Sequence, residues 1–583
     1  MIRRYLSLLV DYLRPQRGRV VALAILLIAG IGFQLVNPQI VRRFIDGATS
    51  GAAHVRLVVL AVLFMVLAVA QQVFSVVATY LAETVGWTAT NELRGDLALH
   101  LLHLDMGFHK TRTPGELIER IDGDITALSN FFSQFVIHVV ANLVLLFGIL
   151  VLLLVENLWI GSGISLFAIA ALAGMMGIQS IAMPWWKRVR QKSAEFYGFL
   201  GEQLGGTEDV RANGGVPFVV SRFTDHVREW LPASVRGFMG WAHLWSTNIV
   251  LFSALTSLVY WLGSRFFGSG VLTIGSVYLV FSYSELMRQP MDRIRTQMQD
   301  LQKAAAALTR VESLLALDSK LSSDGAHHLP DGALSVVFDG VSFAYQDGDD
   351  DKGEIVLEGL DLRIAAGRVL GVLGRTGSGK TTLARLLTRL YDPIGGAVLV
   401  GDVRLDQTDP EHLRSRVGMV TQDVQLFRAT VRDNLTFFDS RIDDRRIRAV
   451  LEELGLTVWV EGLSDGLDTM LEAGGGGLSA GEAQLLAFTR IFLRDPGLVI
   501  LDEASSRLDP ATEQLIEHAV DRLMSDRTGI VIAHRLATVT RADDILILDG
   551  GRIVEYGSRQ ALVDDPESRF AYFLRVGMEE VLS

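Results

Sequence analysis

A glycine-rich stretch, Gly374–Thr381, offers the clearest chemistry in the sequence. It reads Gly-Arg-Thr-Gly-Ser-Gly-Lys-Thr, follows the apolar run Val369–Leu373 and precedes a Leu-rich segment, which predicts a strand, a loop and a helix. In that context backbone amides can wrap phosphates, Lys380 can reach the β- and γ-phosphates of ATP, and the Thr381 hydroxyl can ligate Mg²⁺. The candidate nucleotide-binding residues here are Gly374, Arg375, Thr376, Gly377, Ser378, Gly379, Lys380, Thr381 and Thr382.

Polar side chains also follow three other apolar runs, as expected at the carboxyl ends of strands. One run ends in Asp502 and Glu503. Asp502 can hold Mg²⁺, while Glu503 can orient or deprotonate the attacking water. Gln422 follows a second run and can touch the metal or the water, and His534 ends a third and can offer a proton to the γ-phosphate. Candidate catalytic residues are therefore Glu503, His534 and Gln422, and candidate metal ligands are Thr381, Gln422 and Asp502.

Two further segments complete this set. Leu478–Glu482 opens a helix directly after four glycines, Gly474–Gly477, so its free amides can face an anion. Tyr345 stands in a predicted strand and can stack on adenine. Each feature alone also fits an ordinary turn or core residue, but their joint order and spacing favour a nucleotide site.

Composition places this site in an unusual chain. The 583 residues include no Cys, only 21% are charged, the net charge is −12 and the mean hydropathy is +0.32. A disulfide framework is excluded, and the acidity argues against nucleic acid as a partner. Residues 1–320 carry 27 Lys and Arg against 22 Asp and Glu, a net of +5, which leaves −17 for residues 321–583. The chain therefore consists of two consecutive parts that differ in composition and in the sign of their net charge.

The N-terminal part predicts an integral membrane domain. Six runs without Asp, Glu, Lys or Arg stand at 20–41, 57–82, 125–155, 157–186, 237–264 and 266–284. Each is long enough to cross a bilayer as a helix, whereas buried helices of a soluble core would show polar faces. Arg14, Arg17 and Arg19 precede the first run and Lys187 and Arg188 follow the fourth. By the positive-inside rule, both termini are expected to be cytoplasmic in a multi-pass protein of the cell membrane.

The connections after the second and fourth runs are informative because they are long. Residues 83–130 and 187–236 are too long for structureless loops, so the spans are expected to continue as helices into the cytoplasm. Gly and Pro near 108–117 and 209–218 predict breaks there. These two turning points could dock on a soluble domain.

With these motifs and these apolar runs together, the chain resembles a half-transporter of the ATP-binding cassette (ABC) exporter type over essentially its whole length. The resemblance implies a six-helix transmembrane domain at 1–317, a linker at 318–333 and an α/β nucleotide-binding domain of the P-loop type at 334–583. It implies that Gly374–Thr381 is the Walker A motif and Leu498–Asp502 the Walker B motif. It further implies roles for Glu503 as catalytic carboxylate, Gln422 as the Q-loop, His534 as the switch histidine, Tyr345 as the adenine-stacking aromatic and Asp509 as the end of the D-loop, and it makes the two turning points coupling helices.

One element departs from the family pattern. The signature Leu-Ser-Gly-Gly-Gln reads Leu478-Ser-Ala-Gly-Glu482 here. Ser479 and Gly481 keep a hydroxyl and an amide for a γ-phosphate, but Ala480 restricts the backbone and Glu482 adds negative charge. Poor hydrolysis at that site would fit one subunit of a heterodimeric exporter, the one that carries the catalytic glutamate, so a heterodimer is favoured over a homodimer.

The expected function is ATP-driven export of an amphipathic or lipophilic substrate, such as a drug, lipid or peptide, by alternating access. One Walker A motif and one signature within a single domain cannot face each other, so two chains must pair around two ATP molecules, with Mg²⁺ as cofactor. Alternatives are a homodimeric exporter and an importer of a siderophore-like compound on the same fold. A nucleotide-gated channel is disfavoured by Glu503 and His534.

Overall fold

The protein forms two compact units that are interleaved in sequence. The computed structural model describes residues 12–135, 139–321, 325, 327–345, 353–502, 510–533 and 539–576. Unit 1 comprises Met1–Leu102 and Gly115–Ala316, and unit 2 comprises His103–Pro114 and Leu317–Ser583. A short segment from the first half of the chain therefore belongs to the second unit. The predicted fold class is confirmed, because a helical unit is joined to an α/β unit.

Unit 1 is built entirely of helices in its described residues. The long helices are α2 (Arg17–Thr49), α3 (His54–His103), α7 (Ala141–Glu156), α8 (Leu158–Gly205), α10 (Val216–Gly268), α11 (Ile274–Leu286) and α12 (Arg288–Leu315). The shorter helices are η1 (Arg14–Gln16), α5 (Pro114–Ile118), η2 (Glu119–Asp124), α6 (Ile125–Phe135) and α9 (Thr207–Ala212).

Four of these helical segments are long and apolar enough to cross a membrane. Among the described residues they are Arg14–Thr49, His54–His103, Leu158–Gly205 and Val216–Gly268. The third predicted span falls on α6 and α7, and the sixth falls on α11, which gives way to α12 just before Pro290. No part of the most apolar 18-residue window of α3 is buried. Such an exposed apolar surface is explained by lipid rather than by water.

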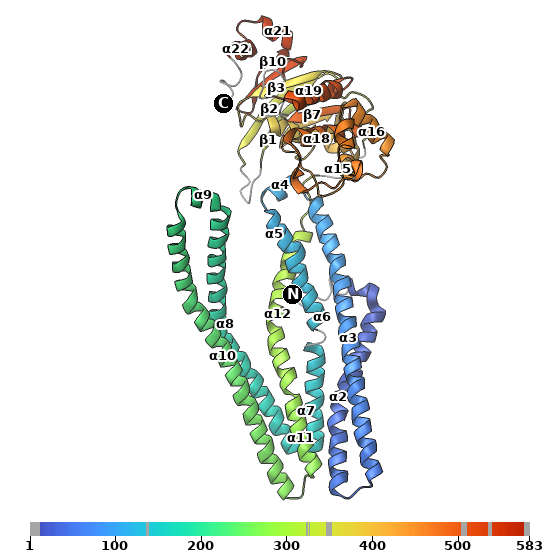
Figure 1. Ribbon diagram of the computed structural model, residues 1–583, viewed down its shortest axis with the longest axis vertical. Coiled ribbons are helices and arrows are strands. Elements are labelled where there is room, and N and C mark those ends of the chain that lie inside the picture. The colour runs from blue at the N-terminus through green and yellow to red at the C-terminus, as the bar shows by residue number, and fades with distance from the viewer. Residues whose placement is uncertain are drawn as a thin grey trace. The chain divides into compact units, whose positions relative to one another are not determined.

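The helices after the second and fourth runs continue well past the bilayer thickness, as predicted. α3 has 50 residues, α8 has 48 and α10 has 53, and 50 residues of α-helix extend about 75 Å. α8 and α10 lie side by side, and α9 forms the turn between them (Figure 1). The other turning point holds α4 (Met106–Lys110), which Asp105 begins by accepting a hydrogen bond from the Phe108 amide.

A polar cluster joins α2 to α7 and α11 at the ends remote from these turns. Arg42 Nη1 lies 2.6 Å from Glu156 Oε2, and the Ser276 hydroxyl donates to Glu156 Oε1 at 2.9 Å. Asp46 accepts from the Gly275 amide at 2.9 Å and from the Thr273 hydroxyl. Asp46 thereby satisfies a free amide at the start of α11, which ties the first and last long apolar segments together.

Unit 2 contains two sheets. The first has the order β2-β1-β4-β5 and is antiparallel; the second has the order β10-β9-β3-β8-β7-β6, parallel except for β10. The strands are β1 (Val336–Ala344), β2 (Ile355–Ile364), β3 (Val369–Gly374), β4 (Gly395–Val400), β5 (Val403–Arg404), β6 (Val417–Val420), β7 (Leu498–Asp502), β8 (Thr528–Ile532), β9 (Asp544–Asp549) and β10 (Arg552–Ser558).

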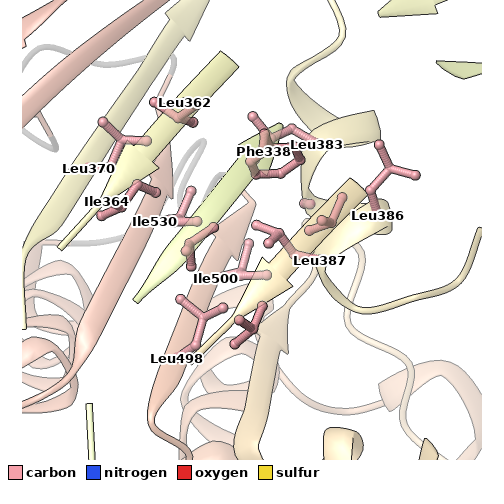
Figure 2. Packing of buried hydrophobic residues seen from close by; sticks show 14 of the residues in the cluster. Phe338, Leu362, Ile364, Leu370, Leu383, Leu386, Leu387, Leu498, Ile500 and Ile530 are labelled. Atoms are coloured by element: carbon pink, nitrogen blue, oxygen red, sulfur yellow. The ribbon is translucent and has the colours of Figure 1, made fainter. Parts of the chain in front are cut away.

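Helices pack on both faces of the six-stranded sheet. The α-helices that follow β3 in the described residues are α13 (Lys380–Leu387), α14 (Pro410–Arg416), α15 (Val431–Thr436), α16 (Asp444–Glu453), α17 (Thr457–Glu461), α18 (Ala480–Arg494), α19 (Pro510–Met524), α21 (Arg559–Asp564) and α22 (Arg569–Val576). Leu498 and Ile500 of β7 pack with α13 and the small sheet (Figure 2), whereas Val499 and Leu501 pack with α18 and α19. Because successive strand residues point to opposite faces, a continuous apolar run is required here.

We expect Asp46→Ala to lower the free energy of unfolding by about 1 to 2 kcal/mol, since it leaves the Gly275 amide without its side-chain acceptor. The measurement is the unfolding temperature of the protein in lipid nanodiscs. Thr49→Ala is the control, because the Thr49 hydroxyl donates to carbonyls of its own helix. Equal unfolding temperatures for the two variants would contradict this role for Asp46.

Candidate functional site

Three of the predicted site residues, Gly374, Asp502 and Gln422, lie at or just beyond the ends of parallel strands. β3, β8, β7 and β6 are consecutive in the sheet, and the register pairs Val372 with Ile532 and Asp502 with the same Ile532. The carboxyl ends of these strands therefore meet at one edge of the sheet. Gly374 and Asp502 end their strands there, and exposed Gln422 lies two residues beyond β6. Glu503, Asp509 and His534 lie outside the described residues.

The loop from Gly374 to Gly379 needs its glycines for two reasons. Gly374 has φ 151° and Gly379 has φ 103°, a region that favours glycine. A Cβ on Gly374 would lie 2.3 Å from the Leu548 carbonyl oxygen, and one on Gly379 would lie 2.5 Å from Leu357 Cδ2. The glycines thus let the backbone curl tightly between β3 and α13, in the position where a glycine-rich loop can bind phosphate.

Two side chains of this loop fit a polyphosphate. Lys380 begins α13, is only 6% exposed, and donates through Nζ to the carbonyl oxygens of Gly374 at 2.6 Å and Arg375 at 3.1 Å. Ser378 Oγ is buried and finds no hydrogen-bond partner among the described residues. The buried Lys380 ammonium and the Ser378 hydroxyl lie in one short loop, and a phosphate could accept a hydrogen bond from each.

The residues predicted to hold Mg²⁺ supply only oxygen ligands. Thr381 stands in the first turn of α13, next to Lys380, and Asp502 closes β7. Both are half-buried, whereas Gln422 is exposed on its loop. A hydroxyl, a carboxylate and an amide oxygen match the preference of Mg²⁺ for hard ligands completed by phosphate oxygens and water.

Tyr345 is held by contacts that sequence reasoning missed. Its hydroxyl lies 3.0 Å from Thr382 Oγ1 and accepts from Arg385 Nη1 at 2.9 Å, so the predicted aromatic platform is anchored to the phosphate-loop helix. Lys110 Nζ of α4 lies over the ring, 4.4 Å from its centroid. Both α4 and Tyr345 belong to unit 2, so this cation–π contact joins the turn after α3 to the candidate nucleotide site.

The signature segment adopts an ordinary helix start in spite of its departures. Gly474, Gly475 and Gly477 have positive φ, and Ser479 is the N-cap of α18. Ala480 is the first helical residue and is not among the positive-φ residues, so its Cβ causes no backbone strain. Ser479 and Ala480 are exposed and Gly481 is buried, which leaves the hydroxyl of Ser479 accessible.

Glu482 is directed back into its own unit. Its Oε2 accepts from the Ser479 amide at 2.7 Å, while the Glu482 amide donates to Ser479 Oγ at 3.2 Å, forming a capping box. Its Oε1 accepts from the Trp459 indole Nε1 at 2.8 Å. The negative charge expected to disturb a nearby phosphate is therefore compensated by two N–H groups, and Trp459 could not be found from the motif alone.

A buried arginine connects the signature helix to the segment after Gln422. Arg490 of α18 donates to the carbonyl oxygens of Gln425 at 3.0 Å and Asn434 at 2.7 Å. Burial, aided by Arg494, lowers the pKa of Arg490 to about 10, which leaves it charged at neutral pH. The loop that carries Gln422 is thus tied to the helix that begins at Ser479.

Comparison with known proteins agrees with this geometry. The model of the ABC transporter transmembrane region matches residues 20–291, and the ABC transporter model matches residues 357–506. The ATP-dependent lipid A-core flippase of Chromobacterium violaceum is 31% identical over 492 residues, which cover 83% of this chain and 82% of that protein. The chain is an ABC transporter. With both parts in one polypeptide, it is a membrane exporter that binds and hydrolyses ATP.

Two other relatives place this ABC transporter among exporters. A multidrug efflux ATP-binding/permease protein of Mycobacterium bovis is 32% identical over 478 residues, covering 81% of this chain and 39% of that longer protein. The solved structure of a bacterial Atm1-family ABC exporter with ATP bound has a TM-score of 0.80 and 25% sequence identity, and the match covers 96% of this chain and 98% of that one. The resemblance predicted from the sequence motifs is confirmed.

We expect Ser378→Ala to weaken ATP binding about tenfold, the loss of one hydrogen bond to a charged group. The nucleotide-free protein should keep its unfolding temperature, because Ser378 Oγ has no partner in the described residues to lose. Displacement of a fluorescent ATP analogue by ATP with Mg²⁺ gives the affinity. Ser415→Ala, on the exposed end of α14, is the matched control; the same affinity for both variants would argue against phosphate contact by Ser378.

Proposed function

We propose that this ABC transporter exports an amphipathic or lipophilic compound across the cell membrane by alternating access, driven by ATP. The observation that carries the proposal is the position of α4. This helix follows directly from α3, a candidate membrane span, yet it belongs to the nucleotide-binding unit and places Lys110 over Tyr345. A rearrangement at the nucleotide site that moves α4 would therefore also move α3, because the two helices are consecutive in the chain.

The residues that line a cavity in unit 1 support a lipophilic substrate. A cavity of about 260 Å³ lies between α2, α3, α6 and α7 and is lined by apolar residues, among them Leu23, Leu27, Ala82, Phe131 and Val144. Such a cavity can accept an alkyl or aromatic group without leaving a polar atom unsatisfied. The named relatives handle lipid A-core and multiple drugs, which agrees with an amphipathic substrate for this chain.

The transporter acts as a dimer in this proposal. α4 belongs to unit 2 of its own chain, whereas α9 belongs to unit 1. Leu204 and Phe218, on either side of α9, are 72% and 70% exposed, although a solvated turn has no need of large apolar groups. We therefore assign α9 as the coupling helix for the nucleotide-binding unit of a second half-transporter.

The two nucleotide sites are composite. The phosphate loop of one subunit binds ATP, and the exposed start of α18 in the other subunit supplies Ser479 and Gly481 to the γ-phosphate. Closure of the two units around ATP would move α4 and α9 and switch the membrane cavity from inward to outward access, with both termini on the cytoplasmic side. The helical geometry of Ala480 and the compensated Glu482 support a competent signature, and hence the homodimer alternative, whereas the sequence pattern alone favours a heterodimer.

The residues at the strand ends carry out hydrolysis. Thr381, Asp502 and Gln422 would hold Mg²⁺, which supplies charge neutralisation for the transferred phosphoryl group. Glu503, the residue after β7, orients and deprotonates the attacking water, and His534, soon after β8, donates to the γ-phosphate. Tyr345 binds the adenine ring, and Asp509 completes the segment after Glu503.

We expect Glu503→Gln to retain ATP binding and to lose at least about 99% of ATP turnover, because the amide cannot accept the proton of water. Phosphate release and ATP affinity are measured on the same preparation. Glu452→Gln makes the same chemical change at an exposed position of α16 and should leave both values unchanged. Turnover of Glu503→Gln within threefold of wild type would remove Glu503 from the catalytic role.

The identity of the second subunit can be decided by expressing this chain alone. A homodimer with two competent sites should give robust ATPase activity that a transported compound stimulates in reconstituted vesicles. A panel of drugs, lipids and peptides, with and without the product of the neighbouring reading frame, separates the two assemblies. Activity that appears only with the second product would establish the heterodimer.

A further inference from the structure

The altered last residue of the signature, Glu482, has a specific partner in this chain. The family pattern has Gln at this position, and Gln has one acceptor oxygen and an NH₂ group that only donates. Here two N–H groups point at the side chain, the Ser479 amide at 2.7 Å and the Trp459 indole at 2.8 Å. A carboxylate can accept both on separate oxygens, whereas an amide can accept only one without sharing.

The two hydrogen bonds join different elements. Trp459 belongs to α17 and is partly buried against the apolar cluster that includes Leu485 and Phe488 of α18. Its indole is therefore fixed by packing and can hold the Glu482 carboxylate in place. Glu482 in turn fixes the Ser479 amide, and its own amide donates to Ser479 Oγ at 3.2 Å. Ser479 Oγ accepts this bond, and because a hydroxyl can accept and donate at the same time, its hydrogen can still be donated outward.

We propose that Glu482 and Trp459 form a positioning pair that directs the Ser479 hydroxyl at the γ-phosphate of ATP bound by the partner subunit. The inference rests on the proposed function, in which α18 faces that nucleotide. It makes the departure from Gln a compensated change: the carboxylate matches the extra indole donor. Glu482 is a positioning residue that does not touch ATP, and the signature is competent because of it.

The first test compares Glu482→Gln, Trp459→Phe and the double variant in nanodiscs, with kcat and KM for ATP measured separately. Each single change leaves one polar group of the pair without its partner, and we expect kcat to fall roughly five- to tenfold, the equivalent of one hydrogen bond. In the double variant the introduced amide side chain would face only the Ser479 amide, so most of the lost activity should return. Losses that simply multiply would overturn the pairing.

A second arm separates positioning from general stability. Ser479→Ala removes the hydroxyl that Glu482 is proposed to direct, so adding Glu482→Gln to Ser479→Ala should lower kcat by less than twofold. If Glu482→Gln lowers kcat as much in that background as in wild type, or changes only the unfolding temperature, the proposal is wrong. Glu472→Gln, exposed just before the glycine run, is the matched control.

A third arm does not depend on turnover. In a Glu503→Gln background, closed dimers should retain radiolabelled ATP through rapid desalting, and Glu482→Gln should reduce the retained ATP roughly five- to tenfold. If Glu482→Gln leaves the amount of retained ATP unchanged, the positioning role is wrong, but the proposed composite site still stands. Failure of the Glu503→Gln protein to retain ATP at all would instead count against the proposed composite site.

Discussion

The parallel register of β3, β8, β7 and β6 is the constraint on which the nucleotide chemistry depends. Because these strands run the same way, residues more than a hundred positions apart in sequence end at one edge of one sheet. A slip of one residue would turn Leu498 and Ile500 to the other face and move Asp502 away from the phosphate loop. The register is fixed by burial on both faces, so the core and the site are specified together.

Short sequence patterns are enough to predict much of the fold of both units. The glycine pattern and the strand before it define the phosphate loop because only glycine fits the φ of Gly374 and Gly379. Long uncharged runs define the membrane helices, since a bilayer excludes charge irrespective of which helices pack together. In both cases the deciding interaction lies within about ten to thirty residues of chain, and the pattern alone carries it.

Tertiary contacts account for what the sequence could not predict. The effect of Glu482 depends on an indole at position 459, and a carboxylate without that donor would have the disturbing charge expected from the motif. The anchoring of Tyr345 likewise depends on a hydrogen bond from Arg385 of α13 and on Lys110 of α4, which is more than 200 residues away in sequence. A motif specifies residues one at a time, whereas in the folded chain neighbours from other elements decide whether a departure such as Glu482 is harmful or compensated.

The interleaving of the two units has a consequence for biosynthesis. α4 is translated about 230 residues before β1, the first strand of the unit to which α4 belongs. At about 5 to 20 residues per second, α4 therefore waits some ten seconds or more at the membrane before any of its partner surface exists. Docking of α4 must be one of the last events of folding, so a chain stalled before its final domain would remain inserted in the membrane but unable to respond to ATP.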